Sequence, residues 1–344
     1  SDTLRKAKQG FAMAASGGVK AAQLNLAKIY INEAEKSPNQ SIKKYTKAQK
    51  LLKRAQSSAQ RGVADEAKNY LTNLAKQLQP ALKKRTYDQL HWISLPSGSF
   101  LMGDPKGNED AKVVHKVQVK AFSLSASEVT VTQYQSCVLA GKCDPLNIDK
   151  KGCNHRKNNH GNLPVNCVSW IEARAFAQWV GGDLPSETQW EYAARSAGQF
   201  ARYPWGDQKA TCTLAVMRDE QTKSAKIQNH RKRSKGAQGC GKDGAWPVCT
   251  KTAGMSKQGL CDMIGNLWEW TLDEYRPHYD QTHKTDLPVC ASKRCTDDKG
   301  IKRVIRGAGY MTKSSGTTAT MRSKSDRAAS GIGFRVALKT QMDE

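Results

Sequence analysis

The sequence LPSETQWEYAAR over residues 184–195 shows how the second half of this chain is built. Ser186 and Gln189 lie three residues apart in the pattern of a capping box, in which two side chains satisfy backbone N–H groups at the start of a helix. Glu187 adds a negative charge to the first turn, where the helix dipole favours it. The stretch therefore predicts a helix that starts after Ser186 and runs through Ala194.

The sequence around this helix predicts short strands and two more helices. Gly, Pro, Asn and Asp interrupt the apolar runs, as is typical of short strands joined by turns. Strands are expected at 92–95, 99–102 and 116–119, and helices at 132–138, after the cap Thr130, and at 169–179. The pattern predicts a mixed α+β domain over residues 91–344.

Residues 1–90 differ from the rest, because Ala, Lys, Gln and Leu recur there at helical spacing from Leu4 to about Leu82. A turn is expected at 37–40. The pattern Ala-x-x-Gly-Val occurs twice, from Ala15 and from Ala59. This all-α segment resembles Sel1-like or tetratricopeptide-type helical repeats, which implies a protein-binding platform. The alternative is a helical spacer or a dimerising hairpin, and the sequence assigns no oligomeric state.

Net charge is positive in both parts of the chain, but its density is higher in residues 1–90. The 344 residues include 55 Lys+Arg and 31 Asp+Glu, a formal charge of +24. Residues 1–90 hold 18 basic and 6 acidic residues, which leaves +12 for each part. The basic residues are spread out, and no aromatic stacking platform accompanies them, so no specific nucleic-acid site is expected. We expect a protein partner, acidic in character, or an anionic membrane surface. No apolar run reaches the ~20 residues of a transmembrane helix.

All ten cysteines lie from Cys137 onward, and an even number of cysteines favours disulfides in an oxidising compartment. We therefore expect a periplasmic, secreted or cell-surface protein. Sequence cannot fix the connectivity, but closeness along the chain suggests the pairs Cys137/Cys143, Cys153/Cys167, Cys240/Cys249, Cys290/Cys295 and Cys212/Cys261. The alternative is zinc at Cys153, His155, His160 and Cys167, which lacks the short Cys-x2-4-Cys element of structural zinc sites.

A series of motifs resembles the formylglycine-generating-enzyme, or sulfatase-modifying-factor, domain. They occur in the order of that family and cover about residues 92–340. The resemblance implies a C-type-lectin-like α+β fold with little regular secondary structure. The motifs are LPSGSFLMG (95–103), EVTVTQY (128–134), LPV (163–165), VSW (168–170), LPSETQWEYAAR (184–195), YPWGD (203–207), GNLWEW (265–270), RVIRG (303–307) and GFRVA (333–337).

The resemblance also implies a calcium site. By position in the family motif, the ligands are the Asp262 and Glu269 side chains and the Gly265 and Leu267 carbonyls. Hard oxygen ligands of this kind suit Ca²⁺. The alternative is that Glu269 forms a salt bridge to Arg306 or Arg335, because a buried carboxylate needs a partner.

The enzymes of this family oxidise a substrate cysteine to formylglycine with copper held by two cysteines. Those cysteines precede an Arg-Ser pair, which is Arg322-Ser323 here. Counting back places Ser314 and Ala319 at the two copper positions. Neither side chain binds Cu(I), which requires soft thiolate ligands. The sequence therefore predicts that no catalytic residues of this type remain and that copper is not a cofactor.

The expected function is a non-catalytic extracytoplasmic binding or signalling module. The sensory ectodomain of a bacterial Ser/Thr kinase and a type VI secretion accessory factor are the roles that the resemblance suggests. The alternatives are a metal-dependent oxidase of the family and the ligand-displaying variable protein of a diversity-generating retroelement. For a ligand-displaying surface, the candidate residues are Tyr310, Lys313, Arg322, Lys324 and Arg327. An iron-dependent relative is disfavoured, because no histidine precedes His91.

Overall fold

A computed structural model describes residues 2–16, 18–35, 41–146, 152–156, 161–219, 238–242, 244–279, 282, 284–290 and 300–339. The chain divides into two units. The helical unit comprises Ser1–Lys83 and Ser136–Lys142, and the mixed unit comprises Lys84–Gln135 and Cys143–Glu344. The predicted boundary at residue 90 follows the end of a long helix that begins in the helical unit and ends at Gln89.

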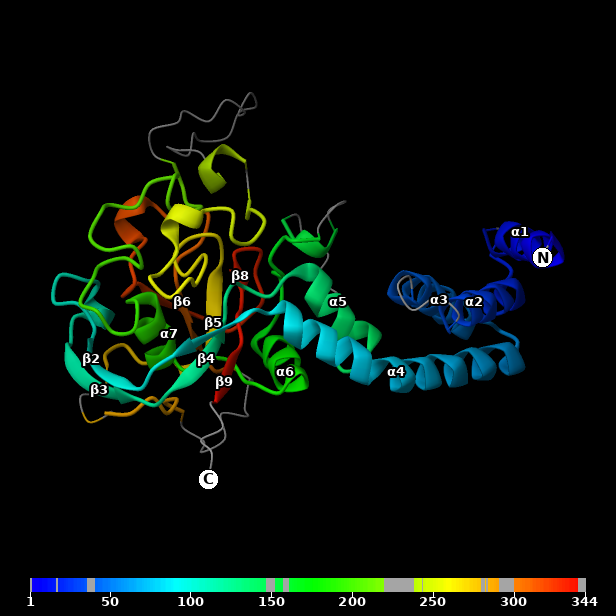
Figure 1. Cartoon of the computed structure of the whole chain (residues 1–344), viewed down its shortest axis with the longest axis horizontal. Helices are drawn as coiled ribbons and strands as arrows, with labels where there is room; N and C mark the ends of the chain where they lie inside the picture. Colours follow the sequence, from blue (N-terminus) through cyan, green and yellow to red (C-terminus); the bar gives the residue numbers. More distant parts are fainter. Residues whose placement is uncertain are drawn as a thin grey trace. The chain divides into compact units, whose positions relative to one another are not determined.

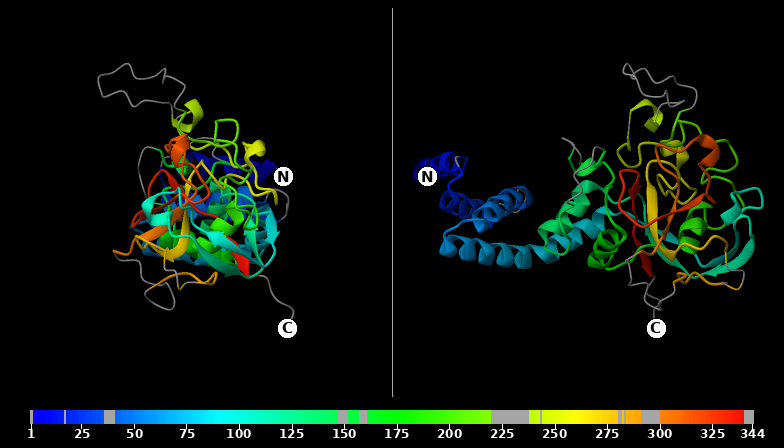
Figure 2. Two further views of the ribbon diagram at one scale, coloured as in Figure 1. Left: turned by 90° about the vertical axis from the view of Figure 1, so that its left-hand side faces the viewer. Right: turned by 180° about the vertical axis from the view of Figure 1, so that it is seen from behind.

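The N-terminal residues form four helices, as the apolar spacing predicts: α1 (Asp2–Ser16), α2 (Lys20–Glu35), α3 (Ser41–Gln56) and α4 (Arg61–Gln89). Helices α2 and α3 lie side by side in both views (Figures 1 and 2). Small side chains such as Ala27, Ala48 and Ala55 are fully buried, which lets helices pack closely. Gly18 adopts a left-handed conformation between α1 and α2, as predicted for the turn. The second glycine of the repeat, Gly62, lies inside α4, and the turn predicted at 37–40 falls outside the described residues.

The mixed unit contains three small sheets (Figure 1). The first has the order β1-β4-β9 and the second is the β2-β3 hairpin, both antiparallel. The third has the order β7-β6-β5-β8, in which β8 runs parallel to β5. Their bounds are β1 (Trp92–Leu95), β2 (Gly98–Met102), β3 (His115–Val119), β4 (Phe122–Ser125), β5 (Trp268–Glu274), β6 (Arg303–Arg306), β7 (Arg322–Ser325), β8 (Ile332–Gly333) and β9 (Ala337–Lys339).

The predicted helices of this part of the chain are present as α5 (Val131–Leu139), α6 (Trp170–Val180) and α7 (Glu187–Ala194). The capping box before α7 is confirmed: the Ser186 hydroxyl accepts from the Gln189 N–H, and the Gln189 side chain accepts from the Ser186 N–H. Helix α7 is buried along most of its length. Its Trp190 is fully buried in the core of the mixed unit together with Leu95, Phe122 and Met263. This packing brings the acidic residues of α7 into the interior.

Among the disulfides of the mixed unit, the described residues form the bridges Cys153–Cys167, Cys212–Cys240 and Cys249–Cys261. The first confirms the expected pair and excludes zinc at Cys153 and Cys167, because both sulfur atoms are committed to the bridge. The expected pairs Cys240/Cys249 and Cys212/Cys261 are wrong. The segments around Cys212 and Cys240 lie close together in the fold. The Cys240 N–H donates to the carbonyl of Met217, five residues after Cys212. No described cysteine is free, and Cys137, Cys143 and Cys290 are also disulfide-bonded. His160 and Cys295 fall outside the described residues.

Disulfides on this scale indicate folding in an oxidising environment. Within the described ranges, none of the helices has the length and apolar character needed to cross a membrane.

Candidate functional site

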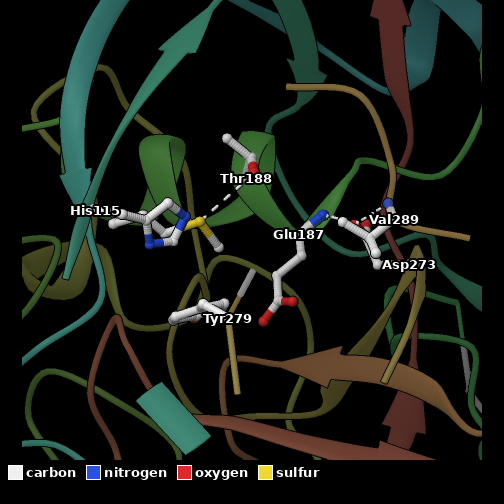
Figure 3. A pocket seen from close by; sticks show the side chains of 7 residues that line it. His115, Glu187, Thr188, Asp273, Tyr279 and Val289 are labelled. Atoms are coloured by element: carbon white, nitrogen blue, oxygen red, sulfur yellow. Dashed lines mark hydrogen bonds between the residues drawn. The ribbon is translucent and has the colours of Figure 1, made fainter. Parts of the chain in front are cut away.

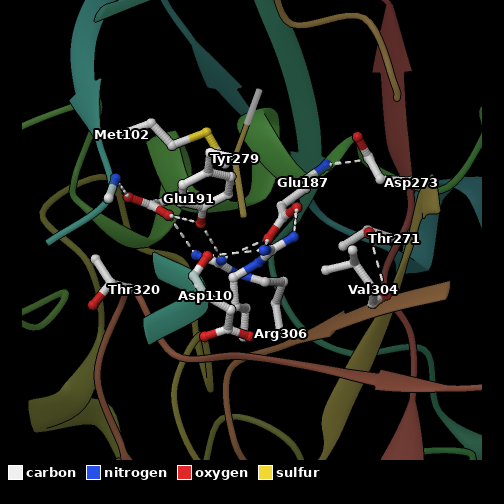
Figure 4. Close-up of polar contacts among 12 residues, drawn as sticks. Met102, Asp110, Glu187, Glu191, Thr271, Asp273, Tyr279, Val304, Arg306 and Thr320 are labelled. Atoms are coloured by element: carbon white, nitrogen blue, oxygen red, sulfur yellow. Dashed lines mark hydrogen bonds and ion pairs between the residues drawn. The ribbon is translucent and has the colours of Figure 1, made fainter. Parts of the chain in front are cut away.

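A buried ion-pair network lies between α7 and the sheet formed by β5, β6 and β7 (Figure 4). The guanidinium of Arg306, on β6, binds the Glu187 carboxylate at 2.8 Å and the Glu191 carboxylate at 2.6 Å. Arg322, on β7, binds both oxygens of Glu187, at 2.7 and 2.8 Å. All four side chains are buried. Helical spacing places the two glutamates one turn apart, so that both bind the guanidinium of Arg306.

Two further side chains, Arg195 and Tyr279, extend the network at Glu191. Arg195 lies 3.1 Å from Glu191, and the Tyr279 hydroxyl donates to Glu191 while it accepts from Arg306. Burial opposes ionisation of Glu191, but Arg195 and Arg306 outweigh it and lower its pKa. Burial, followed by the negative charge of Glu191, raises the pKa of Tyr279 well above its ordinary value. The network therefore holds fixed charges and acts as a structural clamp between α7 and the sheet.

A small cavity lies beside this network (Figure 3). It has a volume of about 20 Å³, room for roughly one water molecule and not for a peptide or an organic cofactor. Its polar lining comes from different elements, since His115 belongs to β3, Thr188 to α7 and Asp273 to β5. The lining residues are Met102, His115, Glu187, Thr188, Asp273, Tyr279 and Val289.

Asp273 anchors two segments at this cavity. Its carboxylate accepts from the backbone N–H of Glu187, at the start of α7, at 2.6 Å and from that of Val289 at 2.8 Å. Burial, followed by the negative charge of Glu187, raises the pKa of Asp273 to about 7, against the effect of the two N–H donors. The folded protein thus binds a proton here at pH values where the unfolded chain does not.

Replacing Asp273 with asparagine should change how stability depends on pH. Because the folded-state pKa is raised, wild-type stability falls as pH rises from about 4 to about 7, while the side chain of the variant cannot ionise. The shift spans roughly three pKa units. The difference in unfolding free energy, Asp273→Asn minus wild type, should therefore increase by about 4 kcal/mol between pH 4 and pH 8. Urea unfolding of both proteins at several pH values measures this gain, and a constant difference would contradict the raised pKa. The asparagine side chain also leaves one backbone N–H without an acceptor, which adds a penalty independent of pH.

The carboxylate of Glu269, a predicted calcium ligand, forms an ion pair with an arginine. Arg335 binds its carboxylate through two hydrogen bonds, at 2.6 and 2.7 Å, and the Trp190 indole N–H donates to it at 2.8 Å. Of the two arginines considered from the sequence, Arg335 is therefore the salt-bridge partner. Arg306, which is opposite Glu269 in the β5–β6 register, points its guanidinium to α7 instead.

Two further buried carboxylates lie near this pair. Asp262 accepts from the Cys249 N–H at 2.6 Å, and Glu128 accepts from the Leu267 N–H and from the Asn266 side chain. Burial raises the pKa of Asp262 to about 6, and Glu269 contributes to the shift. Burial and the charges of Asp262 and Glu269 raise the pKa of Glu128. Arg335 is hydrogen-bonded to Glu269, and its charge also acts on Asp262 and Glu128, so the cluster has an excess of carboxylates that Lys251 offsets in part at Asp262.

This excess charge and the oxygen donors fit a hard divalent cation. No three His, Cys, Asp or Glu side chains of the described residues converge as a metal site. A calcium ion would therefore need the backbone carbonyls of Gly265 and Leu267 as well, and it would share Glu269 with Arg335. Glu128, which lies 138 residues before Asn266 in the chain, was not predicted from sequence because no motif links the two segments.

The two copper positions contain no metal ligand. Ala319 is fully buried in the hydrophobic core, and its carbonyl accepts from Arg306 at 2.8 Å. Ser314 is also buried, at the start of a short 3-10 helix. No described cysteine is free to replace them.

The predicted ligand surface is only partly exposed. Lys313, Lys324 and Arg327 are exposed. Tyr310 and Arg322 were wrongly predicted as surface residues. Tyr310 packs in an apolar cluster with Val216 and Leu267, and Arg322 is held by Glu187.

The fold and these positions agree with the comparison to known proteins. The model of the sulfatase-modifying factor enzyme 1-like domain matches residues 75–340. The chain belongs to this family. The match covers more than half of the chain and includes the whole network around Arg306.

Curated relatives in the family include both enzymes and an inactive form. The formylglycine-generating enzyme of Mycobacterium tuberculosis is 26% identical over 272 residues, which cover 64% of this chain and 86% of the relative. The inactive C-alpha-formylglycine-generating enzyme 2 of Bos taurus is 30% identical over 51% of this chain and 50% of its own length. The hercynine oxygenase of Mycolicibacterium smegmatis is 26% identical over 54% of this chain and 46% of its own length.

Two solved structures share the fold. PvdO from Pseudomonas aeruginosa superposes with a TM-score of 0.55 and 23% identity, over 72% of this chain and 93% of PvdO. Treponema denticola variable protein 1 superposes with a TM-score of 0.52 and 17% identity, over 72% of this chain and 94% of that protein. The expected fold of the formylglycine-generating-enzyme family is confirmed.

Proposed function

We propose that this protein is a non-catalytic binding or signalling module that works outside the cytoplasm. The observation that carries the proposal is the pair Ser314 and Ala319 at the positions where the family's enzymes hold copper. Ala319 is buried in the hydrophobic core, and its backbone carbonyl accepts a hydrogen bond from Arg306. Copper(I) needs thiolates, and the described cysteines are all in disulfides.

A comparison with a relative also supports this proposal. One relative, of Bos taurus, is named an inactive C-alpha-formylglycine-generating enzyme 2, so a protein of this kind without the activity has a precedent among the relatives. The disulfides support a periplasmic, secreted or cell-surface location, and a sensory ectodomain of a kinase or a type VI accessory factor would fit it. The helical unit, with Sel1-like or tetratricopeptide-like character, would then provide a second protein-binding surface.

Copper binding tests the proposal. Titration of Cu(I) against a chromophoric chelator should show no stoichiometric transfer of the metal to the protein. A copper-binding member of the family serves as the positive control. Retention of one Cu(I) per chain against the chelator would contradict the proposed loss of the site.

We also propose that calcium binds at Asp262, Gly265, Leu267 and Glu269. The support is the excess negative charge of Asp262, Glu128 and Glu269 around Arg335. A divalent cation would neutralise the charge that otherwise has to be removed by protonation.

Removal of calcium should therefore destabilise the protein. At a free Ca²⁺ concentration of about 100 times the dissociation constant, the expected gain in unfolding free energy is about 2.7 kcal/mol. Melting curves in Ca²⁺ and in EDTA measure the gain. Asp262→Asn should reduce it, whereas Asp183→Asn, at a half-exposed carboxylate paired with Arg174, should leave it unchanged. A wild-type melting temperature that does not respond to EDTA would count against the site.

A further inference from the structure

Two lysines meet on one tryptophan ring of the mixed unit. The ammonium groups of Lys242 and Lys251 lie 3.9 and 4.1 Å from the centroid of the Trp246 ring. In the described part of the chain, neither ammonium has a carboxylate within 4.0 Å or a hydrogen-bond acceptor. Burial and the charge of Lys242 lower the pKa of Lys251, and Asp262 offsets this only at longer range. Two positive charges therefore lie together on one ring, and among the described carboxylates Asp262 offsets the charge of Lys251 without a direct ion pair.

The Trp246 ring is held rigidly. Its indole N–H donates to the carbonyl of Gly239 at 2.8 Å, and its backbone N–H donates to the Asn266 side chain at 2.9 Å. The inner part of the residue packs against the cluster that contains Tyr310 and Leu267. A fixed aromatic ring with cations beside it is a preorganised platform, which lowers the entropy cost of binding.

A third basic residue lies in the same region of the fold. Gly239 and Asn266, which hold Trp246, also bond the backbone of Tyr310. The next residues of that segment pair with Arg218, whose N–H donates to the carbonyl of Thr312 at 2.8 Å. The Nε of Arg218 is buried and has no partner among the described residues.

We propose that Lys242, Lys251 and Trp246 form a binding site for an acidic peptide segment of a protein partner. Carboxylate side chains would accept from the ammonium groups, which the Trp246 ring holds close together through cation–π contacts. Lysine ammonium groups act as mobile point charges, so they can follow carboxylates along a flexible chain. A membrane surface is the less suitable occupant, because anionic lipids bind through clusters of four or more basic residues, at about 1 kcal/mol for each. This inference rests on the proposed binding function and names the partner's chemistry.

The test is fluorescence anisotropy of a fluorescein-labelled hexaglutamate peptide with the full chain at physiological ionic strength, with hexaglutamine as the uncharged probe. The double variant Lys242→Gln and Lys251→Gln should raise the dissociation constant about tenfold, which corresponds to two partly exposed ion pairs. The matched control is Lys106→Gln with Lys116→Gln, which removes the same charge at two exposed sites of the mixed unit. It should change the dissociation constant by no more than about twofold.

Several outcomes would overturn the site: no binding of hexaglutamate to wild type, an equal loss in both double variants, or equal binding of hexaglutamine. Vesicles of phosphatidylcholine with phosphatidylserine provide the membrane arm. Loss of vesicle binding in the Lys242/Lys251 variant, with hexaglutamate unable to compete, would assign the lysines to lipid and also overturn it. Oxygen uptake with a cysteine peptide, measured on the same preparation, reports on the proposed function alone. If the peptide binds and oxygen is also consumed, only the proposed function is contradicted. If the peptide does not bind and no oxygen is consumed, only the proposed binding site is contradicted.

Discussion

Replacing Arg306 with Met should lower the free energy of unfolding by about 3–5 kcal/mol, because it leaves buried carboxylates without their partner. Glu191 is fully buried and would retain Arg195, the Tyr279 hydroxyl and the Gly103 backbone N–H, but it would lose its shortest ion pair. Glu187 would retain Arg322. Met keeps most of the side-chain volume, so the loss reports on charge and not on a cavity. Urea unfolding followed by tryptophan fluorescence measures the change.

The matched control is Arg174→Met. Arg174 also forms a two-armed ion pair, with Asp183, but both side chains are partly exposed, at 17% and 33%. Its loss should cost no more than about 1 kcal/mol. A double-mutant cycle with Glu191→Gln provides a second test, since removal of both partners should cost less than the sum of the single changes. Equal, small losses for Arg306→Met and Arg174→Met would contradict a buried clamp.

Removal of the Cys212–Cys240 bridge should cost about 3–4 kcal/mol, since this bridge closes the longest of the three described loops, with a separation of 28 residues. The Cys249–Cys261 bridge, with a separation of 12, should contribute about 3 kcal/mol. Double Cys→Ser variants at each bridge, compared by urea unfolding, measure these losses.

The connectivity itself can be mapped directly. Trypsin cleaves after Lys209, Arg218, Lys235, Lys242 and Lys251, which places the four cysteines on separate peptides. Non-reducing mass spectrometry should find the 212 peptide joined to the 240 peptide and the 249 peptide joined to the 261 peptide. The pairs 240–249 and 212–261, or free thiols in the native protein, would contradict the structure.

The sequence was sufficient for features that depend on near neighbours. The capping box of Ser186 and Gln189 needs only four consecutive residues, and it is present as predicted. The strands at 92–95 and 116–119 follow from apolar alternation and adjacent turns, and the structure confirms both. Motif order then identified the fold, because many short motifs in one order leave few alternatives.

Features that depend on distant contacts could not be predicted. Nearness in sequence suggested Cys240 with Cys249, but the chain folds Cys240 onto the segment of Cys212. Arg322 lies in a Ser/Lys-rich stretch that is typical of an exposed surface, yet it is buried beside Glu187 and the Tyr279 ring. From the sequence, the position of Glu187 is explained by the helix dipole alone. Its ion pair with Arg306 could not be predicted, because the two residues are 119 positions apart in the chain.

The most direct test of the proposed function is oxygen consumption by the copper-loaded full chain with a cysteine-containing peptide and a reductant. The peptide is analysed by mass spectrometry before and after incubation, and a copper-dependent formylglycine-generating enzyme is run in parallel. With Ser314 and Ala319 at the copper positions, we expect oxygen consumption equal to the protein-free control and an unchanged peptide. Copper-dependent oxygen uptake together with conversion of the peptide cysteine to an aldehyde would show that the chain is an enzyme, and it would contradict the proposed function.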